Sequence, residues 1–214
     1  MNSFIISSNW QKSGIKDPDK MISKVFTHYP LSSYRMFIRD VVQYVLSFQK
    51  IDYHKKDLLH LFKMQEAAII AASLINMEAR KNPVIIKAVH LTQLDHFTIQ
   101  EEEQAQWDDI PRTLSSDEVL NPYITLKYFF KHHNLKTWQM ILKKLFHYSK
   151  TKKFAFQDSL LINPIATCDY LLKLTEALHL IYVREIFPAA NIRPQCRAIL
   201  KTEQPPVTKP DTFI

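Results

Sequence analysis

The chain of 214 residues contains one glycine, Gly14. Phosphate-binding loops, dinucleotide-binding turns and the nucleophile elbow of hydrolases each need several glycines, because the backbone there approaches a ligand closely or adopts a positive φ. Parallel α/β folds also use glycine freely in their turns. The scarcity of glycine therefore excludes these sites in their usual form, and it favours helices joined by short loops that Asn, Ser and Pro cap.

Four dipeptides that pair a capping side chain with a proline predict the starts of helices. An Asp or Asn side chain can accept a hydrogen bond from the first turn, and proline fits the first helical position because its missing N–H would have no partner there. These dipeptides are Asp17-Pro18, Asn82-Pro83, Asn121-Pro122 and Asn163-Pro164. Together with hydrophobic spacing they predict helices over residues 18–28, 33–50, 53–81, 83–100, 122–133, 135–150, 164–187 and 194–201.

The spacing of apolar residues predicts which helix faces are buried. Residues 53–81 carry a stripe at 3.6-residue spacing, and its small alanines would let a second helix pack closely. Residues 33–50 carry another such stripe, and no alternating strand pattern occurs in the chain. The first stripe consists of Leu58, Leu61, Phe62, Gln65, Ala68, Ile69, Ala72 and Asn76, and the second of Tyr34, Phe37, Ile38, Val41, Val45 and Phe48.

These patterns predict an all-α fold, a compact bundle of about seven or eight helices in a single domain over residues 1–202. Residues 203–214 contain three prolines and few apolar groups, so we expect a flexible tail there. A helical-repeat solenoid is the alternative, because three Asn-Pro starts lie 39 and 42 residues apart, close to the period of stacked helical repeats. The segments between these starts do not match one another, which favours the bundle.

Cysteine usage and hydropathy predict a reduced, cytoplasmic protein. The two cysteines, Cys168 and Cys196, are too few for a disulfide framework. The longest apolar run, residues 67–75, is far shorter than the roughly 18 residues of a membrane span. The first ten residues lack the basic region of a secretory signal. We therefore expect no membrane partner.

Positive charge is concentrated in residues 121–153. The whole chain carries a net charge of +7 and this segment alone carries +8, so the remaining residues sum to −1. Such concentration is expected of a nucleic-acid footprint. Basic residues in the segment recur at three- and four-residue steps, opposite an apolar side. The candidate interaction face, here called the basic face, consists of Lys127, Lys131, Lys136, Lys143, His147 and Lys150.

The aromatic residues of this segment separate from its lysines in helical projection. Trp138, Phe129 and Phe146 fall on the apolar side, which predicts that they pack in the core. Stacking on nucleic-acid bases requires aromatic side chains that are exposed beside the cations. The basic face is therefore also compatible with a plain solvated surface.

Residues 101–118 offer a third interpretation of the basic face, because they carry seven carboxylates against Arg112 alone. This net charge of −6 directly precedes the basic segment. The two segments could pair within one molecule or across a protein interface. The acids are Glu101, Glu102, Glu103, Asp108, Asp109, Asp117 and Glu118.

Two carboxylate–histidine pairs raise the question of a metal site. Glu176-x-x-His179 and Asp57-x-x-His60 each place the two ligand types one helical turn apart, and di-iron bundles use two Glu-x-x-His pairs. His60 falls opposite the apolar stripe of its helix, and Asp stands where the pattern needs Glu. We therefore predict no metal and no cofactor, and we interpret His179 as a core histidine bonded to a neighbouring carboxylate or carbonyl. Cys168 is expected to pack, since it lies past the first turn of its helix.

Taken together, these features predict a protein-interaction or regulatory module without catalytic activity. Its expected partner is a protein, either a second copy of the chain or another protein. A nucleic-acid-binding helical domain that uses the basic face within residues 127–153 is the alternative. A helical enzyme with an unrecognised site is the third hypothesis.

Overall fold

The computed structural model describes residues 17–47, 53, 55–78, 83–99, 107–150 and 163–188. Within these residues every regular element is a helix and none is a strand. The α-helices are α2 (Pro18–His28), α3 (Leu31–Ser47), α4 (Lys55–Glu78), α6 (Ser116–Leu120), α7 (Tyr123–His132), α8 (Leu135–Tyr148) and α9 (Pro164–Ile181). Two 3₁₀ helices, η1 (Ala88–Thr92) and η2 (Leu94–His96), and a π-helix that continues α9, η5 (Tyr182–Ile186), complete the described part.

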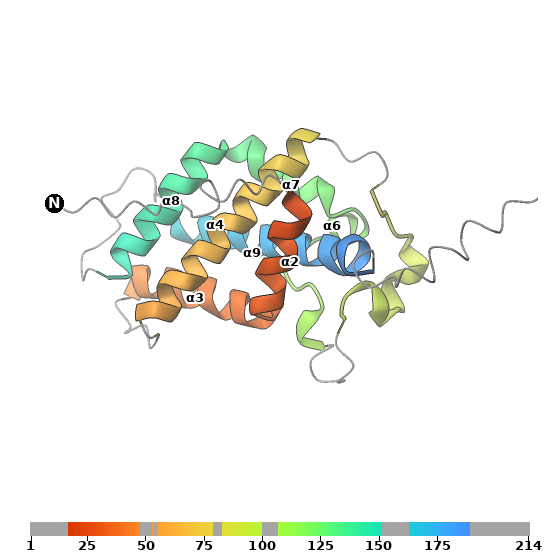
Figure 1. Cartoon of the computed structure of the whole chain (residues 1–214), viewed down its shortest axis with the longest axis horizontal. Coiled ribbons are helices and arrows are strands. Elements are labelled where there is room, and N and C mark those ends of the chain that lie inside the picture. The colour runs from red at the N-terminus through yellow and green to blue at the C-terminus, as the bar shows by residue number, and fades with distance from the viewer. Residues whose placement is uncertain are drawn as a thin grey trace, which may run out of the picture.

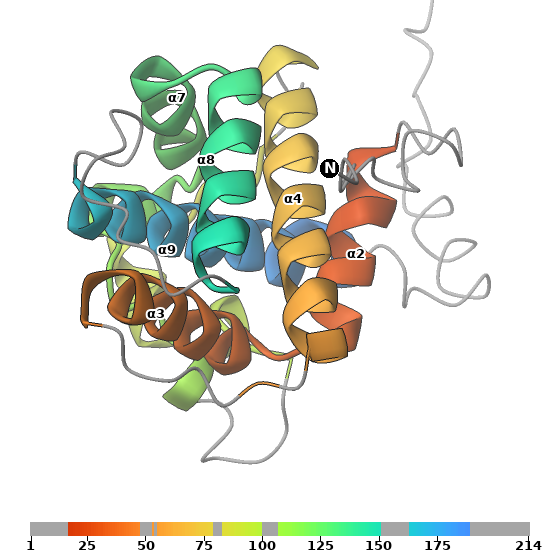
Figure 2. The ribbon, with the colours of Figure 1, turned by 90° about the vertical axis from the view of Figure 1, so that its left-hand side faces the viewer.

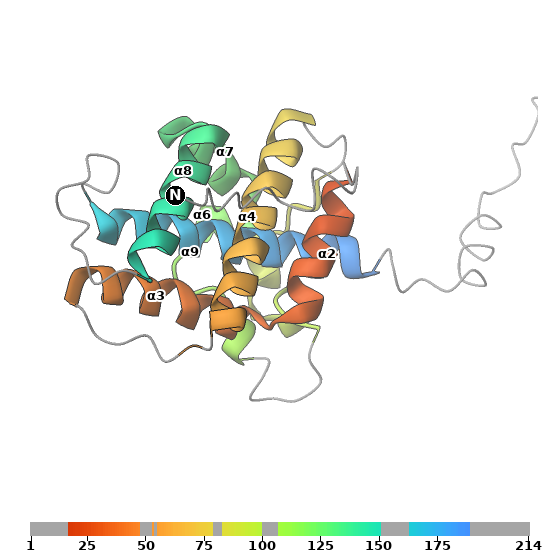
Figure 3. The ribbon, with the colours of Figure 1, turned by 60° about the vertical axis from the view of Figure 1, so that its left-hand side comes forward.

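Helices that are far apart in the sequence pack against one another. In Figure 2, α4 and α8 stand side by side, α9 crosses them, and α3 runs below α9. Figures 1 and 3 show the same crossing, with α2 next to α4. The contacts of α3 with α9 and of α4 with α8 join segments that a solenoid would keep apart, because each solenoid repeat touches only its neighbours. The predicted all-α compact bundle is therefore confirmed.

Helices α4 and α9 form the centre of the bundle and are buried around most of their circumference. Ala67, Ala68, Ala71 and Ala72 of α4 are at most 1% exposed, so neighbouring helices can approach its axis closely. The stripe predicted for this helix is buried except for Asn76, which is half-buried. The stripe predicted in α3 is buried from Tyr34 to Val45, and residue 48 lies outside the described part.

Helix α4 is also long and apolar enough to cross a membrane. The segment Lys56–Glu78 contains an apolar window of 18 residues with a mean hydropathy of 1.4, and it is the single described helix that meets these criteria. The core helix of a soluble protein meets them too, and 72% of the apolar window of α4 is buried inside the protein. Its neighbours in the bundle thus account for the apolar character of this helix.

Three of the four predicted helix starts are found. Asp17 accepts hydrogen bonds from the amides of Asp19 and Lys20, and Asn163 accepts one from the amide of Ala166, at 2.9 Å. Helix α7 begins one residue later than Asn121-Pro122 predicts, and the Asn121 side chain accepts from the Tyr123 amide at 3.2 Å. These caps satisfy N–H groups that have no partner within the helix.

The helix predicted over residues 83–100 is wrong. Residues 83–87 lack regular structure, and the two 3₁₀ helices follow. Tertiary contacts hold the backbone instead: the Val84 amide donates to Glu185 at 3.0 Å, and the Ile86 amide donates to the Leu120 carbonyl at 3.2 Å. Ile85 and Val89 are exposed by 54% and 71%, so the apolar residues here do not form one buried helix face.

The sequence interpretation also missed α6, which begins within the acidic residues 101–118. Ser115 and Glu118 form a capping box: the Ser115 hydroxyl accepts from the Glu118 amide, and the Glu118 carboxylate accepts from the Ser115 amide at 2.8 Å. This Ser-x-x-Glu pattern was visible in the sequence. The predicted helix over 194–201, the domain boundary at 202 and the tail over 203–214 lie outside the described residues and stay predictions.

Candidate functional site

All six side chains of the basic face are exposed to solvent. Lys127 and Lys131 lie on α7, Lys136, Lys143 and His147 on α8, and Lys150 follows the end of α8. Two large apolar side chains are exposed on the same helices, Tyr128 by 58% and Met140 by 38%. Cationic and apolar groups are therefore presented together on α7 and α8, although their role as an interaction face stays a prediction.

The prediction that Trp138, Phe129 and Phe146 pack in the core is confirmed. Trp138 and Phe129 are each 1% exposed and Phe146 is 5% exposed. The Trp138 indole N–H donates to the Phe129 carbonyl at 3.1 Å, and the two rings stack with their centroids 4.0 Å apart. These three side chains cannot serve as stacking platforms for nucleic-acid bases while the bundle is folded.

Three of the acids before the basic segment bind groups outside the basic face. Asp108 pairs with Arg112 at 3.0 Å, Asp109 accepts from the Thr98 hydroxyl at 2.8 Å, and Glu118 pairs with Lys173 at 2.8 Å. Burial alone would raise the pKa of Glu118, but the hydrogen bonds from Lys173 and Ser115 outweigh it and hold the pKa below its ordinary value. Glu101, Glu102 and Glu103 lie outside the described residues. Asp108, Asp109 and Glu118 therefore do not show the predicted pairing with the basic face within one molecule.

Glu176 forms the centre of a buried polar network rather than a metal site. Its carboxylate accepts from Arg35 at 2.7 Å, from the amides of Arg112 and Thr113 at 3.0 and 2.8 Å, and from the Thr113 hydroxyl at 2.8 Å. Arg35 donates in turn to the carbonyls of Asp108 and Ile110. The Arg35–Glu176 pair thereby fastens residues 108–113, here called the tethered loop, to helices α3 and α9.

His179 is a core residue, as predicted, but it lacks the predicted hydrogen bond. Its Nε2 atom lies 3.9 Å from the Asp109 carboxylate, beyond hydrogen-bonding distance, and its Nδ1 atom has no partner. Burial, together with the nearby positive charges of Arg35 and Arg184, lowers the pKa of His179 to about 3. The ring is therefore neutral and packs edge-on against Phe26, with centroids 5.0 Å apart.

The chemistry of the described residues offers neither an activated thiol nor a metal cluster. Cys168 is half-buried against the core, and burial, aided by Asp169, raises the pKa of its thiol to about 11. A thiol with this pKa is protonated near neutral pH and is a poor nucleophile. In the part of the chain that the structure describes, no group of three or more His, Cys, Asp and Glu side chains is placed to hold a metal ion.

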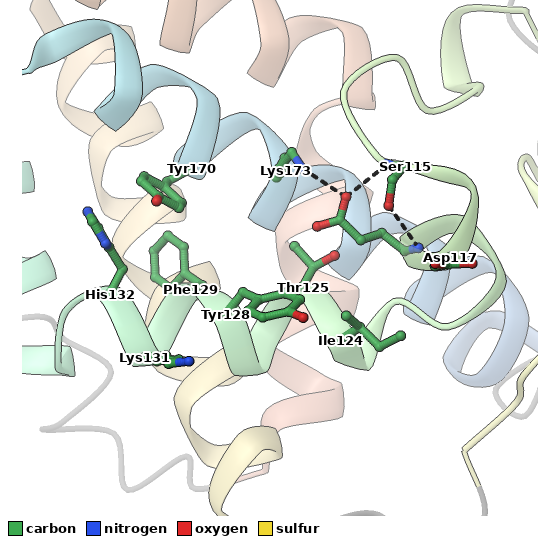
Figure 4. Close-up of a pocket in the computed structure, with 11 residues that line it drawn as sticks. Ser115, Asp117, Ile124, Thr125, Tyr128, Phe129, Lys131, His132, Tyr170 and Lys173 are labelled. Atoms are coloured by element: carbon green, nitrogen blue, oxygen red, sulfur yellow. Dashed lines mark hydrogen bonds and ion pairs between the residues drawn. The ribbon is translucent and has the colours of Figure 1, made fainter.

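A groove of about 560 Å³ lies between α7 and α9 and is lined at one end by residues of α6 and its cap. We call it the α7–α9 groove. Figure 4 shows Lys131, His132 and Tyr170 toward one end and Ser115 and Asp117 toward the other. Its lining residues are Ser115, Asp117, Glu118, Ile124, Thr125, Tyr128, Phe129, Lys131, His132, Tyr170 and Lys173.

The groove contains a buried polar group for which the described residues provide no hydrogen-bond partner. Thr125 lies on α7 and is 3% exposed, and its hydroxyl oxygen has no hydrogen-bond partner. Of the predicted basic face, Lys131 alone lines the groove. The sequence interpretation missed the groove because its lining comes from segments that are far apart in the chain and carry no shared local motif.

Comparison with known proteins does not assign the chain to a family. The chain matches no protein-family model, no curated protein and no solved structure. Its function has to be inferred from the side chains that the fold exposes and from the cavities that it forms.

Proposed function

We propose that the protein is an interaction module that binds an acidic segment of a partner protein through the basic face. The observation that carries this proposal is the exposed side of α8. Lys136, Met140, Lys143 and His147 are all exposed and recur at steps of four, three and four residues. Residues at such steps lie along one side of a helix. An apolar side chain thus lies between cationic ones on a single helical surface.

Exposed apolar side chains favour a protein partner over a purely electrostatic one. Met and Tyr are enriched in protein interfaces, where they supply contact area that lysines alone do not. Met140 lies between Lys136 and Lys143, and Tyr128 lies between Lys127 and Lys131 on α7. The lysines would attract and orient an anionic partner, while the apolar side chains would bury area against it. The matching ligand is an amphipathic segment that carries both carboxylates and apolar side chains.

Nucleic-acid binding is the second candidate because three of the acids before the basic segment contact groups outside the basic face. Asp108, Asp109 and Glu118 contact Arg112, Thr98 and Lys173, so a phosphate backbone would not have to displace them from the basic face. Against this candidate, Trp138, Phe129 and Phe146 are buried and unavailable for base stacking.

Two matched triple variants would test the proposal. Lys136, Lys143 and Lys150 are changed to Gln in the first variant, here called the α8 variant. The exposed Lys20, Lys56 and Lys87, which lie outside α7 and α8, are changed to Gln in the second, the control variant. Both remove three positive charges. The probes are a helical peptide with glutamates on one side and leucines on the other, and a polyglutamate of the same charge, and their affinities are measured by fluorescence anisotropy.

The proposal predicts that the unmodified protein binds the amphipathic peptide more tightly than polyglutamate. The α8 variant should lose about tenfold in affinity, whereas the control variant should lose little, because screened charges at a distance contribute weakly. Equal losses in both variants would show that only the net charge matters, and the basic face would then have no specific role.

A further inference from the structure

We propose that the α7–α9 groove binds a small aromatic acid, that is, a planar ring carrying a carboxylate or a phosphate. The groove, of about 560 Å³, lies within the range of roughly 300–1,000 Å³ typical of small-molecule sites. Aromatic, hydroxyl and charged side chains share its lining. Such mixed linings combine apolar contact area with a few polar groups that orient the ligand.

The unpartnered hydroxyl of Thr125 is the observation that points to a ligand. Buried polar side-chain atoms in native proteins nearly always have a hydrogen-bond partner. Thr125 is 3% exposed and lines the groove, yet its hydroxyl has none. Figure 4 shows this side chain reaching from α7 into the space between α7 and α9. A polar atom of a bound molecule would supply the partner that the chain itself does not.

The charged side chains of the groove favour an acidic ligand whose negative charge lies at one end of the groove. Lys173 and Glu118 neutralise each other at 2.8 Å. Asp117 lies at the opposite end of the groove from Lys131 and His132 (Figure 4). An anionic group is therefore attracted most strongly, and repelled least, beside Lys131, where His132 can also donate a hydrogen bond.

The aromatic side chains favour a ring as the body of the ligand. The Tyr170 ring stacks on the His132 ring with their centroids 4.4 Å apart and an angle of 26° between their planes. Tyr128 is 58% exposed and also lines the groove, and Phe129 contributes part of the lining. Aromatic pairs gain from offset-stacked or edge-to-face contacts, which a planar ring in the groove can form with these side chains.

This inference does not rest on the proposed partner protein, although Lys131 belongs both to the basic face and to the groove. The test of the basic face changes Lys136, Lys143 and Lys150, none of which lines the groove. The groove is tested through Thr125, which is not part of the basic face. Either proposal can therefore fail while the other survives.

The experiment titrates the full chain with simple probes and follows the backbone amide signals of α7 by NMR. Phenylacetate and phenyl phosphate contain both the ring and the anion. Phenylacetamide retains the ring without the charge, while acetate and inorganic phosphate retain the charge without the ring. We expect saturable shifts at Thr125 and Lys131 with an aromatic acid, and at least fivefold weaker binding of the other three probes. Comparison of phenylacetate with phenyl phosphate then identifies the anion.

Four variants connect this binding to the groove. Thr125→Val and Lys131→Gln should each weaken the aromatic acid about threefold or more, while Thr125→Ser retains the hydroxyl and should keep most of the affinity. Lys136→Gln, which removes a lysine outside the groove, should have no effect. Without any probe, Thr125→Val should keep or raise the melting temperature, because it removes a buried polar group that has no partner.

Several results would overturn the inference. If phenylacetamide bound as tightly as phenylacetate, the anion would have no role in binding. If acetate bound as tightly as phenylacetate, the ring would have none. If Thr125→Val left the affinity for the aromatic acid unchanged, or if the amide shifts occurred outside α7, the groove would not be the binding site. A marked fall in the melting temperature of Thr125→Val without probe would show that the hydroxyl has a structural partner.

Discussion

At the scale of single residues, Glu66 shows how burial between two helices changes the pKa of a carboxyl group. It is 4% exposed on α4 and accepts from the Gln139 side chain of α8 at 3.4 Å, while its Oε2 atom has no partner. Burial raises the pKa of this carboxyl above its ordinary value, although Lys143 and Gln139 act in the opposite direction. The ionised form is therefore less favourable in the folded protein than in the unfolded chain.

The first prediction concerns the pH dependence that follows from Glu66. Because its pKa is raised on folding, the unfolded chain releases this proton first as the pH rises above about 4.5, and stability is lost from there up to the folded-state pKa. Glu66→Gln abolishes this loss. Urea denaturation should show that the stability of the variant, relative to the unmodified protein, increases as the pH rises above about 4.5. A difference in stability that does not change with pH would contradict the assignment.

The second prediction concerns Trp138. This side chain is 1% exposed, stacks on Phe129 and donates a hydrogen bond to the Phe129 carbonyl. Trp138→Ala should lower the free energy of unfolding by about 3–5 kcal/mol, because it creates a large cavity in the core. Met140→Ala on the exposed side of the same helix should cost far less. Chemical denaturation that gave similar losses for both would mean that the two faces of α8 are assigned the wrong way round.

The roles of Trp138 and Glu176 show what the sequence could and could not predict about residues. Helical spacing places Trp138 among other apolar residues on its own helix, and local information is enough. Glu176 binds Arg35, which is 141 positions away, and backbone amides of the tethered loop. No local pattern reveals such partners, so the sequence indicated a buried carboxylate–histidine pair without its function. Thr125 was missed for the same reason, since its environment is formed by α6, α7 and α9.

At the scale of elements, the buried Arg35–Glu176 pair holds the tethered loop, in which Asp108 and Asp109 are helical and residues 110–113 lack regular structure. Arg35 donates to two of its carbonyls and Glu176 accepts from two of its amides. Four backbone groups of the loop are therefore satisfied by side chains of α3 and α9. A buried pair of this kind is costly to break, because the remaining charge loses its partner.

The third prediction tests this tether. Glu176→Ala should lower the free energy of unfolding by about 3–5 kcal/mol. The double variant Arg35→Met with Glu176→Leu removes both charges, yet it should recover little of the stability, because the amides of Arg112 and Thr113 still lose their acceptor. Hydrogen exchange at these two amides should accelerate in both variants. Full recovery of stability in the double variant would show that the tether contributes nothing beyond the charge pair.

The helix predictions were right where a buried apolar face and a capping residue indicated the same helix. They were wrong where side chains from other elements bind the backbone. Helix α2 has the predicted bounds because the Asp17 cap and its buried face point to the same element. Residues 83–99 have the Asn-Pro start without a packing face, and Arg184 and Glu185 of η5 bind their backbone instead. The sequence contains both residues, but it does not reveal that η5 directs their side chains toward residues 83–99. Helix α6 was detectable from its capping box.

At the scale of the whole molecule, apolar and cationic groups are sorted to opposite sides of α8. Trp138, Ile141 and Leu145 are buried in the bundle, whereas Lys136 and Lys143 are exposed. This sorting is set by helical spacing and was predicted from the sequence. What covers the exposed side depends on another molecule, so neither the spacing nor the fold identifies it. The proposed acidic protein segment follows from the apolar side chains exposed among the lysines.

Removing Lys136, Lys143 and Lys150 should leave the fold intact, which makes the central proposal testable by binding. Solvated surface substitutions usually change stability by less than about 0.5 kcal/mol each. The variant with Lys136, Lys143 and Lys150 changed to Gln should therefore melt at nearly the temperature of the unmodified protein, as measured by circular dichroism. A drop of many degrees would mean that these side chains support the bundle, and loss of binding by this variant would then say nothing about a surface.

The most direct measurement compares the amphipathic acidic peptide with a single-stranded RNA of equal charge, both labelled, over a range of salt concentrations. Interaction through the basic face with a protein segment predicts that the peptide binds more tightly at physiological salt, with a shallow salt dependence, because Met140 and Tyr128 contribute apolar contact. Binding of nucleic acid instead follows counterion release, with a salt slope of about 0.7 for each phosphate contacted on a single strand. Tighter and steeply salt-dependent binding of the RNA, lost in the α8 triple variant, would contradict the proposed function.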